Sequence, residues 1–308
     1  MKTRVGIIGV GAVGSYFLAG LWEKENVEII VIGDEHHQNK AYQTRIINQK
    51  EYHFEIYDET NVGHLDVLFI ACKYQGLEKV CQMLPSIISK DTIVLSLLNG
   101  VDSEEKITQY IPKQQILYAY MMISSQRKGN EINFQPEITP GLFYGELDGN
   151  LHSERIKFLQ KLFQDTWIHH TPIDNIIQGQ WNKFALNMMH NLPQAVVGCG
   201  LGAYEDSQHL KYIAQKIRSE VVQVAKAKGI YLQEYIDTKA LIQVRKDARY
   251  STLQDLDAKR ETEIEMFAGT LLRYAKQYDI QVPYCDMIYH LIKTIEEKNK
   301  GCFDYETI

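Results

Sequence analysis

Over the first 170 residues, short continuous apolar runs alternate with stretches whose apolar residues recur at helical spacing. The runs are 4–8 (RVGII), 27–32 (VEIIVI), 65–71 (LDVLFIA), 92–98 (TIVLSLL) and 116–122 (ILYAYMM). Strands that are buried on both faces read as continuous apolar runs, and the amphipathic stretches between them supply helices that cover those faces. The pattern therefore predicts an α/β domain with a doubly wound parallel sheet.

The spacing of apolar residues along the chain changes near residue 170. From 174 to 299 the apolar spacing is helical, with interruptions at 198–202 (GCGLG), 228–229 (KG) and 282–283 (VP). Before this change, EINFQ (131–135) and GLFYGE (141–146) flank the turn sequence PEITPG and predict an added hairpin. We expect an α/β domain over residues 1–170 and an all-helical domain over residues 171–308.

The first apolar run leads directly into a glycine-rich turn. Gly9, Gly11 and Gly14 follow the order G-x-G-x-x-G immediately before a helical pattern. In that context the first glycine permits a tight turn, the second permits close approach of a pyrophosphate, and the third permits close packing of helix on strand. The segment Gly9, Val10, Gly11, Ala12, Val13 and Gly14 is therefore predicted to bind a dinucleotide diphosphate at a helix N-terminus.

The end of the second run bears on which dinucleotide is bound. Asp34 lies about twenty residues beyond the glycines. Its carboxylate could accept a hydrogen bond from a ribose 2′-hydroxyl, which favours NAD. His36, His37 and Lys40 follow and could instead hold the 2′-phosphate of NADP. Both interpretations stay open.

Two later runs end in polar residues. Lys73 follows the third run and Asn99-Gly100 follows the fourth. Ligands of open α/β sheets bind beyond the carboxyl ends of the strands, so we expect Lys73 to meet a phosphate or ribose, and Asn99 the nicotinamide or the substrate. The alternatives are a solvated loop at Lys73 and a simple turn at Asn99.

A polar face is predicted on the helix QWNKFALNMMHNLPQ (180–194). Lys183, Asn187 and Asn191 recur every four residues and so share one side of a helix that is otherwise rich in apolar residues. This face either lines an active site between the two domains or is a solvated surface between them that has no catalytic role.

In these motifs and several others, the chain resembles the ketopantoate reductase family. The resemblance runs through GVGAVGS (9–15), CK (72–73), NGVDSEE (99–105), WNKFALNMMHNLPQAVVG (181–198), STLQDL (251–256), ETEIEMFAGTLL (261–272) and AKQYDIQVP (275–283). It implies a Rossmann-type N-terminal domain followed by an all-α domain like the C-terminal domain of 6-phosphogluconate dehydrogenase. It also implies reduction of the small 2-oxo acid 2-dehydropantoate to D-pantoate with NADPH, a step of pantothenate biosynthesis.

The resemblance assigns roles residue by residue. Lys183 corresponds to the catalytic lysine, and an ammonium can stabilise and protonate the oxyanion formed by hydride transfer if burial lowers its pKa. Glu263 corresponds to the family's carboxylate, which contacts the cofactor or steers the lysine. The substrate contacts are Asn99, Asn187, Asn191 and Ser251, and the further cofactor contacts are Lys73, Asn99 and Ser124. Gly269 inside a helical stretch suggests a close backbone approach nearby.

The chain departs from the family pattern at three places. Gly33, followed by Asp34, stands where an arginine usually holds the 2′-phosphate; the segment around Gln75 is one residue shorter; and Leu201 stands near a substrate-pocket asparagine. These differences point toward an NAD-dependent D-2-hydroxyacid dehydrogenase for branched or aromatic 2-oxo acids as an alternative. A second alternative is a dinucleotide sensor without turnover, which would not need Lys183 and Glu263.

Composition narrows the class of partner. The net charge of 308 residues is −6 and Lys and Arg form no long run, which disfavours a nucleic acid. Five cysteines without a C-x-x-C motif indicate free thiols in a reducing compartment, and no apolar run is long enough for a membrane span. We expect a cytoplasmic enzyme without a metal, and its long C-terminal helices permit a homodimer.

Overall fold

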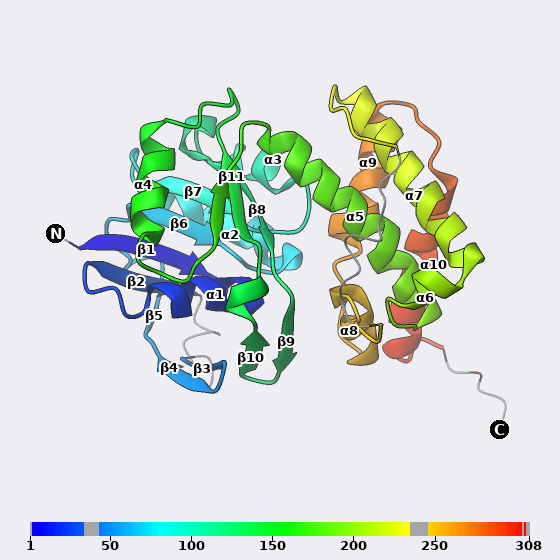
Figure 1. The fold of residues 1–308 in the computed structure, drawn as a ribbon, viewed down its shortest axis with the longest axis horizontal. Helices are drawn as coiled ribbons and strands as arrows, with labels where there is room; N and C mark the ends of the chain where they lie inside the picture. Colours follow the sequence, from blue (N-terminus) through cyan, green and yellow to red (C-terminus); the bar gives the residue numbers. More distant parts are fainter. Residues whose placement is uncertain (1, 34–42, 235–245, 304, 306–308) are drawn as a thin grey trace. The chain divides into compact units, whose positions relative to one another are not determined.

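The computed structural model describes residues 2–33, 43–234, 246–303 and 305 (Figure 1). The chain forms two compact units, Met1–Ile177 and Gln178–Ile308. Each is described here by itself. β12 (His170–Pro172) pairs with β11 (Gly141–Gly145), so the first unit extends past residue 170, where the sequence pattern changes.

The first unit is built on a five-stranded parallel sheet. Four of the five apolar runs form strands of this sheet, but residues 118–122 of the fifth run pair antiparallel with residues 141–145 in another sheet, and the strand Ile56–Tyr57 was not predicted. The strand order of the parallel sheet is β5-β2-β1-β6-β7. The strands are β1 (Thr3–Ile8), β2 (Val27–Ile32), β5 (Ile56–Tyr57), β6 (Val67–Ile70) and β7 (Ile93–Ser96). The chain steps outward from β1 to β5 and then returns to β6 on the other side of β1. The strand order therefore reverses between β1 and β6, the place where open α/β sheets bind ligands.

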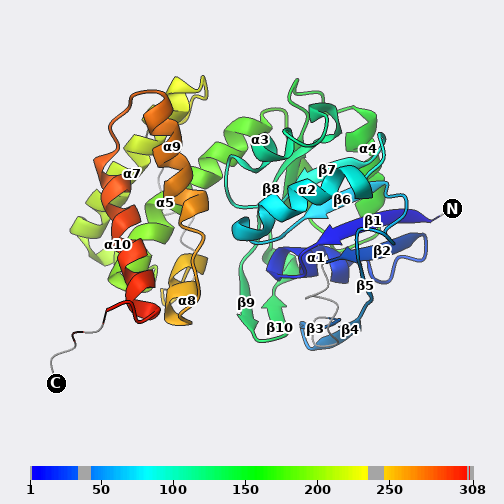
Figure 2. The ribbon, with the colours of Figure 1, turned by 180° about the vertical axis from the view of Figure 1, so that it is seen from behind.

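Helices cover both faces of this sheet. Phe17 of α1 (Ala12–Leu21) stacks on Phe69 of β6 at 4.5 Å between ring centroids, and Phe163 of α4 (Glu154–Phe163) stacks on Phe69 at 6.2 Å. α1 and α4 thus pack on the same face. α2 (Leu77–Ile87) covers the opposite face from α4 (Figures 1 and 2). The short helix α3 (Ser103–Ile107) follows β7.

Two smaller sheets complete the first unit. One has the order β4-β3-β10-β9, and the other β12-β11-β8. Their remaining strands are β3 (Thr44–Ile47), β4 (Lys50–His53), β8 (Tyr118–Met122), β9 (Ser125–Lys128) and β10 (Glu131–Phe134).

The predicted hairpin of 131–135 with 141–146 is wrong. β10 pairs with β9 across a turn at Gly129, whose φ is +61°, and with β3, whereas β11 pairs with β8 and β12. The intervening PEITPG segment forms a 3₁₀ turn (Pro136–Ile138) instead of a hairpin loop and carries the chain from one sheet to the other.

The β3–β4 hairpin was not predicted. Its turn residues Asn48 and Gln49 both have positive φ, +47° and +69°. Two positive φ values suit the twist of a two-residue hairpin, but the usual sequence signal for such a turn is Asn-Gly. Gln49 stands where that signal has glycine, so the sequence TRIINQKEYH does not predict a turn.

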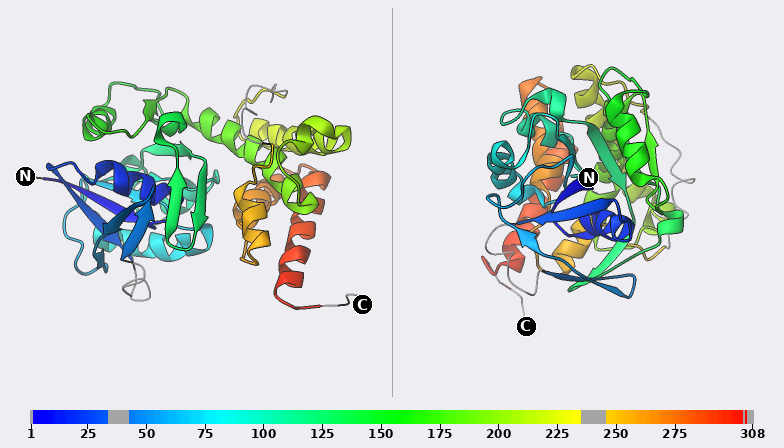
Figure 3. Two further views of the ribbon diagram at one scale, coloured as in Figure 1. Left: turned by 60° about the horizontal axis from the view of Figure 1, so that its bottom comes forward. Right: turned by 90° about the vertical axis from the view of Figure 1, so that its left-hand side faces the viewer.

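The second unit is helical. Its elements are α5 (Ile176–Val197, which begins at the end of the first unit), α6 (Ala203–Asp206), α7 (Gln208–Ala227), α8 (Ser251–Asp257), a π-helical turn (Glu265–Gly269), α9 (Thr270–Gln277) and α10 (Pro283–Asn299). Gly198 and Gly229, with φ of +72° and +80°, follow the ends of α5 and α7, and Pro283 begins α10, so the predicted interruptions are confirmed. α8, the π-helical turn and α9 (gold to orange) lie beside α10 (red) in Figure 3.

Two negative findings apply to the described part of the chain. No helix there is both long and apolar enough to cross a membrane. No group of three or more histidine, cysteine, aspartate or glutamate side chains in these residues is arranged to hold a metal ion. The five cysteines are free thiols.

The close packing of α1 on β1 gives a prediction about two neighbouring glycines. A Cβ atom at Gly14 would lie 1.9 Å from the Gly9 carbonyl oxygen, whereas a Cβ atom at Gly11 would meet nothing within 4 Å. Gly14→Ala should therefore lower the free energy of unfolding by about 1–3 kcal/mol through overpacking. Gly11→Ala, the matched control, should cost less than about 1 kcal/mol. Urea denaturation followed by circular dichroism measures both, and equal stabilities would contradict the prediction.

Candidate functional site

The glycine turn has the geometry that its sequence predicts. Gly9 has a φ of +91°, and a Cβ atom there would lie 2.6 Å from the Ala71 carbonyl oxygen, so the turn rests against the end of β6. Gly11 faces open space and precedes α1, whose first turn has no side-chain cap and no acidic residue. The N–H groups at the start of a helix attract anions, so this turn can hold a diphosphate.

A buried arginine braces the glycine turn. Arg45 of β3 donates from Nε to the Val10 carbonyl oxygen at 3.0 Å and from Nη1 to the Thr44 carbonyl oxygen at 2.8 Å. Its guanidinium therefore links the β3–β4 hairpin to the turn. Sequence reasoning missed Arg45, because the contact depends on a hairpin that the pattern does not predict.

The ribose contact cannot be placed in the same way. Gly33 follows β2 and donates its N–H to the Tyr57 carbonyl oxygen at 3.0 Å. Asp34, His36, His37 and Lys40 lie outside the described residues. The choice between a ribose hydroxyl and a 2′-phosphate therefore stays a prediction.

The other predicted cofactor residues of the first unit follow the carboxyl ends of strands. Lys73 is exposed and precedes a short 3₁₀ turn after β6, and Asn99 is partly buried three residues after β7. β6 and β7 pair in parallel, so both residues lie at the edge of the sheet where the glycine turn lies. Ser124 is exposed and follows β8, and Ile116, two residues before β8, bridges in parallel to Val94 of β7.

In the second unit, α5 carries the three polar residues whose spacing predicts a common face. Lys183 and Asn187 are partly buried, while Asn191 is only 2% exposed. The intervening Phe184 and Met188 are fully buried. The helix thus packs its apolar residues into the core and gives its polar residues a separate side.

Lys183 and Glu263 act on each other electrostatically. Burial lowers the pKa of Lys183 to about 8, because an ammonium loses water, and the Glu263 carboxylate raises that pKa in opposition. Glu263 is itself only 8% exposed. A lysine whose pKa lies near the working pH can give up a proton during a reaction and regain it from water.

Glu263 leads into the π-helical turn. Its carbonyl oxygen accepts from the N–H groups of Met266 and Phe267, and Gly269 donates to the Ile264 carbonyl oxygen in the i→i−5 pattern of a π-helix. Single π-helical turns occur often at functional sites. A Cβ atom at Gly269 would lie 2.7 Å from Glu265 Oε2, so the close approach expected at this glycine involves a flexible side chain.

The polar side of α5 also holds the start of α8, where Ser251 lies. Asn191 accepts from the Thr252 N–H at 3.4 Å. Gln194, fully buried, accepts from the Tyr250 N–H at 2.7 Å and donates to the Ala248 carbonyl oxygen at 3.1 Å. The structure therefore brings Asn191 and Ser251 together. Gln194 was missed, although its position three residues after Asn191 places it on the same side of the helix.

Comparison with known families decides what this pair of units is. Residues 5–146 match the family model "Ketopantoate reductase PanE/ApbA", and residues 175–296 match "Ketopantoate reductase PanE/ApbA C terminal". The chain belongs to the ketopantoate reductase family. Its Rossmann-like first unit and helical second unit are the two parts that these models describe.

Among ketopantoate reductase relatives, two named "2-dehydropantoate 2-reductase" align over nearly the whole chain. The one from Nostoc sp. is 23% identical, over 97% of each chain. The one from Streptococcus pyogenes serotype M1 is 26% identical, over 94% of this chain and 97% of the relative.

Solved structures share the fold. The PanE/ApbA family ketopantoate reductase from Ralstonia eutropha JMP134 has a TM-score of 0.81 at 21% identity, and covers 97% of this chain and 100% of its own. The ternary structure of D-mandelate dehydrogenase with NADH and anilino(oxo)acetate has a TM-score of 0.82 at 23% identity, with the same coverage.

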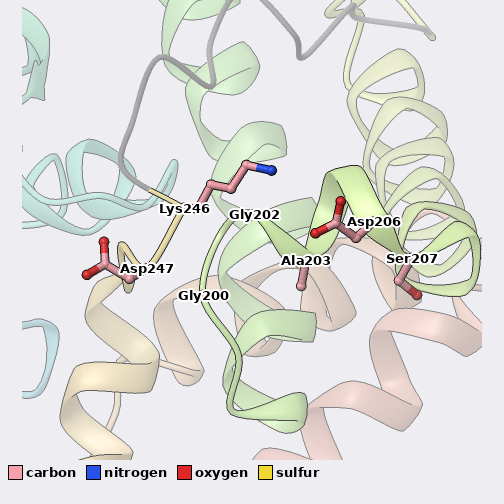
Figure 4. Close-up of a pocket in the computed structure, with 7 residues that line it drawn as sticks. All are labelled: Gly200, Gly202, Ala203, Asp206, Ser207, Lys246 and Asp247. Atoms are coloured by element: carbon pink, nitrogen blue, oxygen red, sulfur yellow. The ribbon is translucent and has the colours of Figure 1, made fainter.

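Leu201, which we expect near the position of the family's substrate-pocket asparagine, is surrounded by apolar residues. Leu201 is buried in a cluster with Met189, Tyr204, Leu210 and Ala214. It lies in the turn between α5 and α6, and its neighbours Gly200 and Gly202 line a hollow shown in Figure 4. The hollow is lined by Gly200, Gly202, Ala203, Asp206, Ser207, Lys246 and Asp247, none of which is a predicted site residue.

Proposed function

We propose that this ketopantoate reductase family member catalyses the NAD(P)H-dependent reduction of 2-dehydropantoate to D-pantoate, with Lys183 as the general acid. The observation that carries the proposal is the match of both units to the ketopantoate reductase family models, and the burial of Lys183, which lowers its pKa to about 8 against the opposing charge of Glu263, supports it. A chain that only sensed a dinucleotide would not need a proton donor of this kind. The names of the curated relatives supply the substrate.

The chemistry needs a positive charge where the substrate oxygen becomes anionic. The bound reduced nicotinamide supplies the hydride. The Lys183 ammonium stabilises the developing alkoxide and donates its proton to that oxygen. Asn187, Asn191, Ser251 and Asn99 bind the carboxylate and hydroxyl groups of the substrate, and the negative charge of Glu263 keeps Lys183 protonated.

The contacts to the cofactor and to the substrate are assigned mainly to different parts of the chain. Residues 1–170 supply most of the dinucleotide contacts and residues 171–308 most of the contacts to the 2-oxo acid. The cofactor contacts are the glycine turn from Gly9 to Gly14, with Asp34, Lys73, Asn99, Ser124 and Glu263. NADPH is the first choice because the family uses it, and NADH is the alternative.

The test of the proposal is a cofactor and substrate panel. Oxidation of NADPH and of NADH is followed by absorbance with 2-dehydropantoate and with branched and aromatic 2-oxo acids. We expect the highest kcat/KM with 2-dehydropantoate. Turnover of only the branched or aromatic acids would refute the proposed substrate, and cofactor binding without any turnover would refute the enzyme.

Replacing the proposed acid should separate catalysis from binding. Lys183→Ala should lower kcat by about 10²–10⁴, the usual contribution of general acid catalysis. Cofactor affinity, measured by calorimetry, should change little, because the glycine turn belongs to the other unit. Lys226→Ala, at an exposed position of α7, is the control. An unchanged kcat in Lys183→Ala would exclude the acid role.

The pKa of Lys183 also predicts a pH dependence. The acid must be protonated before reduction, so kcat/KM for 2-oxo acid reduction should be level below about pH 8 and fall above it. The ordinary lysine pKa of 10.5 would instead leave the rate level until well above pH 9. Steady-state rates from pH 6 to 10 distinguish the two curves.

We further propose a homodimer formed through α10 and α7. Tyr212 of α7, Met287 and Leu291 are 52%, 53% and 42% exposed. Tyr212 lies 3.3 Å from Tyr284, hydroxyl to hydroxyl, and Tyr284, Met287 and Leu291 share one side of α10. A Staphylococcus aureus ketopantoate reductase with this fold is described as dimeric.

Substitution of that surface should release monomers. Met287→Glu combined with Leu291→Glu should halve the mass measured by light scattering, because carboxylates would be buried in the interface. Ile138→Glu, at an exposed apolar residue of the first unit, should leave the mass unchanged. A monomeric wild-type protein would refute the proposed dimer.

A further inference from the structure

The segment around Glu263 is held by one buried carboxylate of α10. Glu296, only 5% exposed, accepts from the Thr262 N–H at 2.7 Å and from the Thr262 hydroxyl at 2.6 Å, both at Oε1. The Thr262 hydroxyl oxygen in turn accepts from the Ile264 N–H at 3.2 Å. The residues on both sides of Glu263 are therefore fixed by the same set of hydrogen bonds.

A second group of charges holds Glu296 itself. Lys293, one turn earlier on α10, lies 3.3 Å from Glu296 Oε2 and 3.5 Å from Glu265 Oε1. Tyr289 donates to the same Glu265 oxygen at 2.8 Å. A buried carboxylate is tolerated when it is paired and hydrogen-bonded, and Glu296 is both. Its two oxygens are divided between Thr262 and Lys293.

We propose that Glu296 is a positioning residue for the acid Lys183: through Thr262 it fixes the backbone that carries Glu263, and so keeps the Glu263 carboxylate within electrostatic reach of Lys183. This inference rests on the proposed function for the role of Lys183, but the geometry of the α10 contact does not depend on that function.

Loss of Glu296 should change the pKa of Lys183 through the position of the Glu263 carboxylate. Burial lowers the pKa of Lys183, and the charge of Glu263 raises it. Loss of Glu296 therefore acts on Lys183 by letting the Glu263 carboxylate move away. The pKa of Lys183 then falls below about 8, and less ammonium is present near neutral pH.

Two substitutions of Glu296 separate positioning from charge. Glu296→Gln keeps an oxygen that can accept from Thr262 while it loses the negative charge facing Lys293. Glu296→Leu loses both. We expect the pKa of Lys183 to be preserved in Glu296→Gln and to fall by about half a unit or more, a threefold change in the protonation equilibrium, in Glu296→Leu.

Glu220 of α7 offers a matched control that binds the other end of α10. It is also 5% exposed and also accepts two hydrogen bonds, from the Tyr284 and Cys285 N–H groups at 2.9 and 2.8 Å, but at the beginning of α10. Glu220→Leu should lower thermal stability as Glu296→Leu does, because each leaves two donors, at least one of them buried, without their acceptor. It should leave the pKa of Lys183 unchanged.

The measurement uses the full chain without cofactor or substrate. The rate of Lys183 acylation by an amine-reactive reagent is followed by peptide mass spectrometry from pH 6 to 10, and its midpoint reports the pKa. In a double-mutant cycle, Glu296→Leu should produce no further shift once Glu263→Gln has removed the charge. Thr262→Val, which removes only the hydroxyl, gives a milder version of the same test if Glu296→Leu does not fold.

Three results would overturn the inference. The first is an unchanged pKa of Lys183 in both Glu296→Leu and Thr262→Val. The second is a shift of the Lys183 pKa in Glu220→Leu as large as that in Glu296→Leu. The third is a full shift of the Lys183 pKa when Glu296→Leu is added to Glu263→Gln. Failure of the proposed function is seen separately, as unchanged turnover in Lys183→Ala, because the labelling experiment requires no turnover.

Discussion

The second unit depends on the balance of two opposing effects at one ammonium. Removal of water from Lys183 favours its neutral form, and the carboxylate of Glu263 favours its charged form. Burial alone would place the pKa of Lys183 below about 8, and the charge of Glu263 alone would place it above the ordinary 10.5. The balance requires that both side chains be held in place, since electrostatic energies change steeply with distance in a poorly solvated site.

Aromatic packing meets much of this requirement. Trp181 and Phe184, on either side of Lys183, pack on Tyr274 of α9 and Phe267 of the π-helical turn, with ring centroids 6.0 and 6.3 Å apart. These contacts hold α5 against the segment that follows Glu263. The apolar residues of the helix therefore decide where its polar residues lie, and the cost of burying the ammonium is met by the packing around it.

Sequence alone predicted the features that depend on local pattern. The continuous apolar runs identified four of the five strands of the parallel sheet, and four-residue spacing placed Lys183, Asn187 and Asn191 on one helix. The pairing of β10 with β9, and the β3–β4 hairpin that delivers Arg45 to the glycine turn, depend on partners distant in the chain. The pairing of Glu263 with Lys183 came from a family resemblance. Spacing places Gln194 on the polar side of α5, but its partners Tyr250 and Ala248, like the partner Thr262 of Glu296, are distant in the chain.

The π-helical turn between Glu263 and α9 has a consequence for evolution by insertion and deletion. A π-helical turn accommodates one residue more than the α-helical turn it replaces. If one residue between Glu265 and Gly269 were deleted, the chain could continue as an ordinary α-helix. Everything upstream would then rotate by about 100° around the axis of α9, and Glu263 would point elsewhere. The length of this short segment thus sets the direction around the axis of α9 in which the Glu263 carboxylate points. Side-chain substitutions elsewhere would not restore that direction after a deletion.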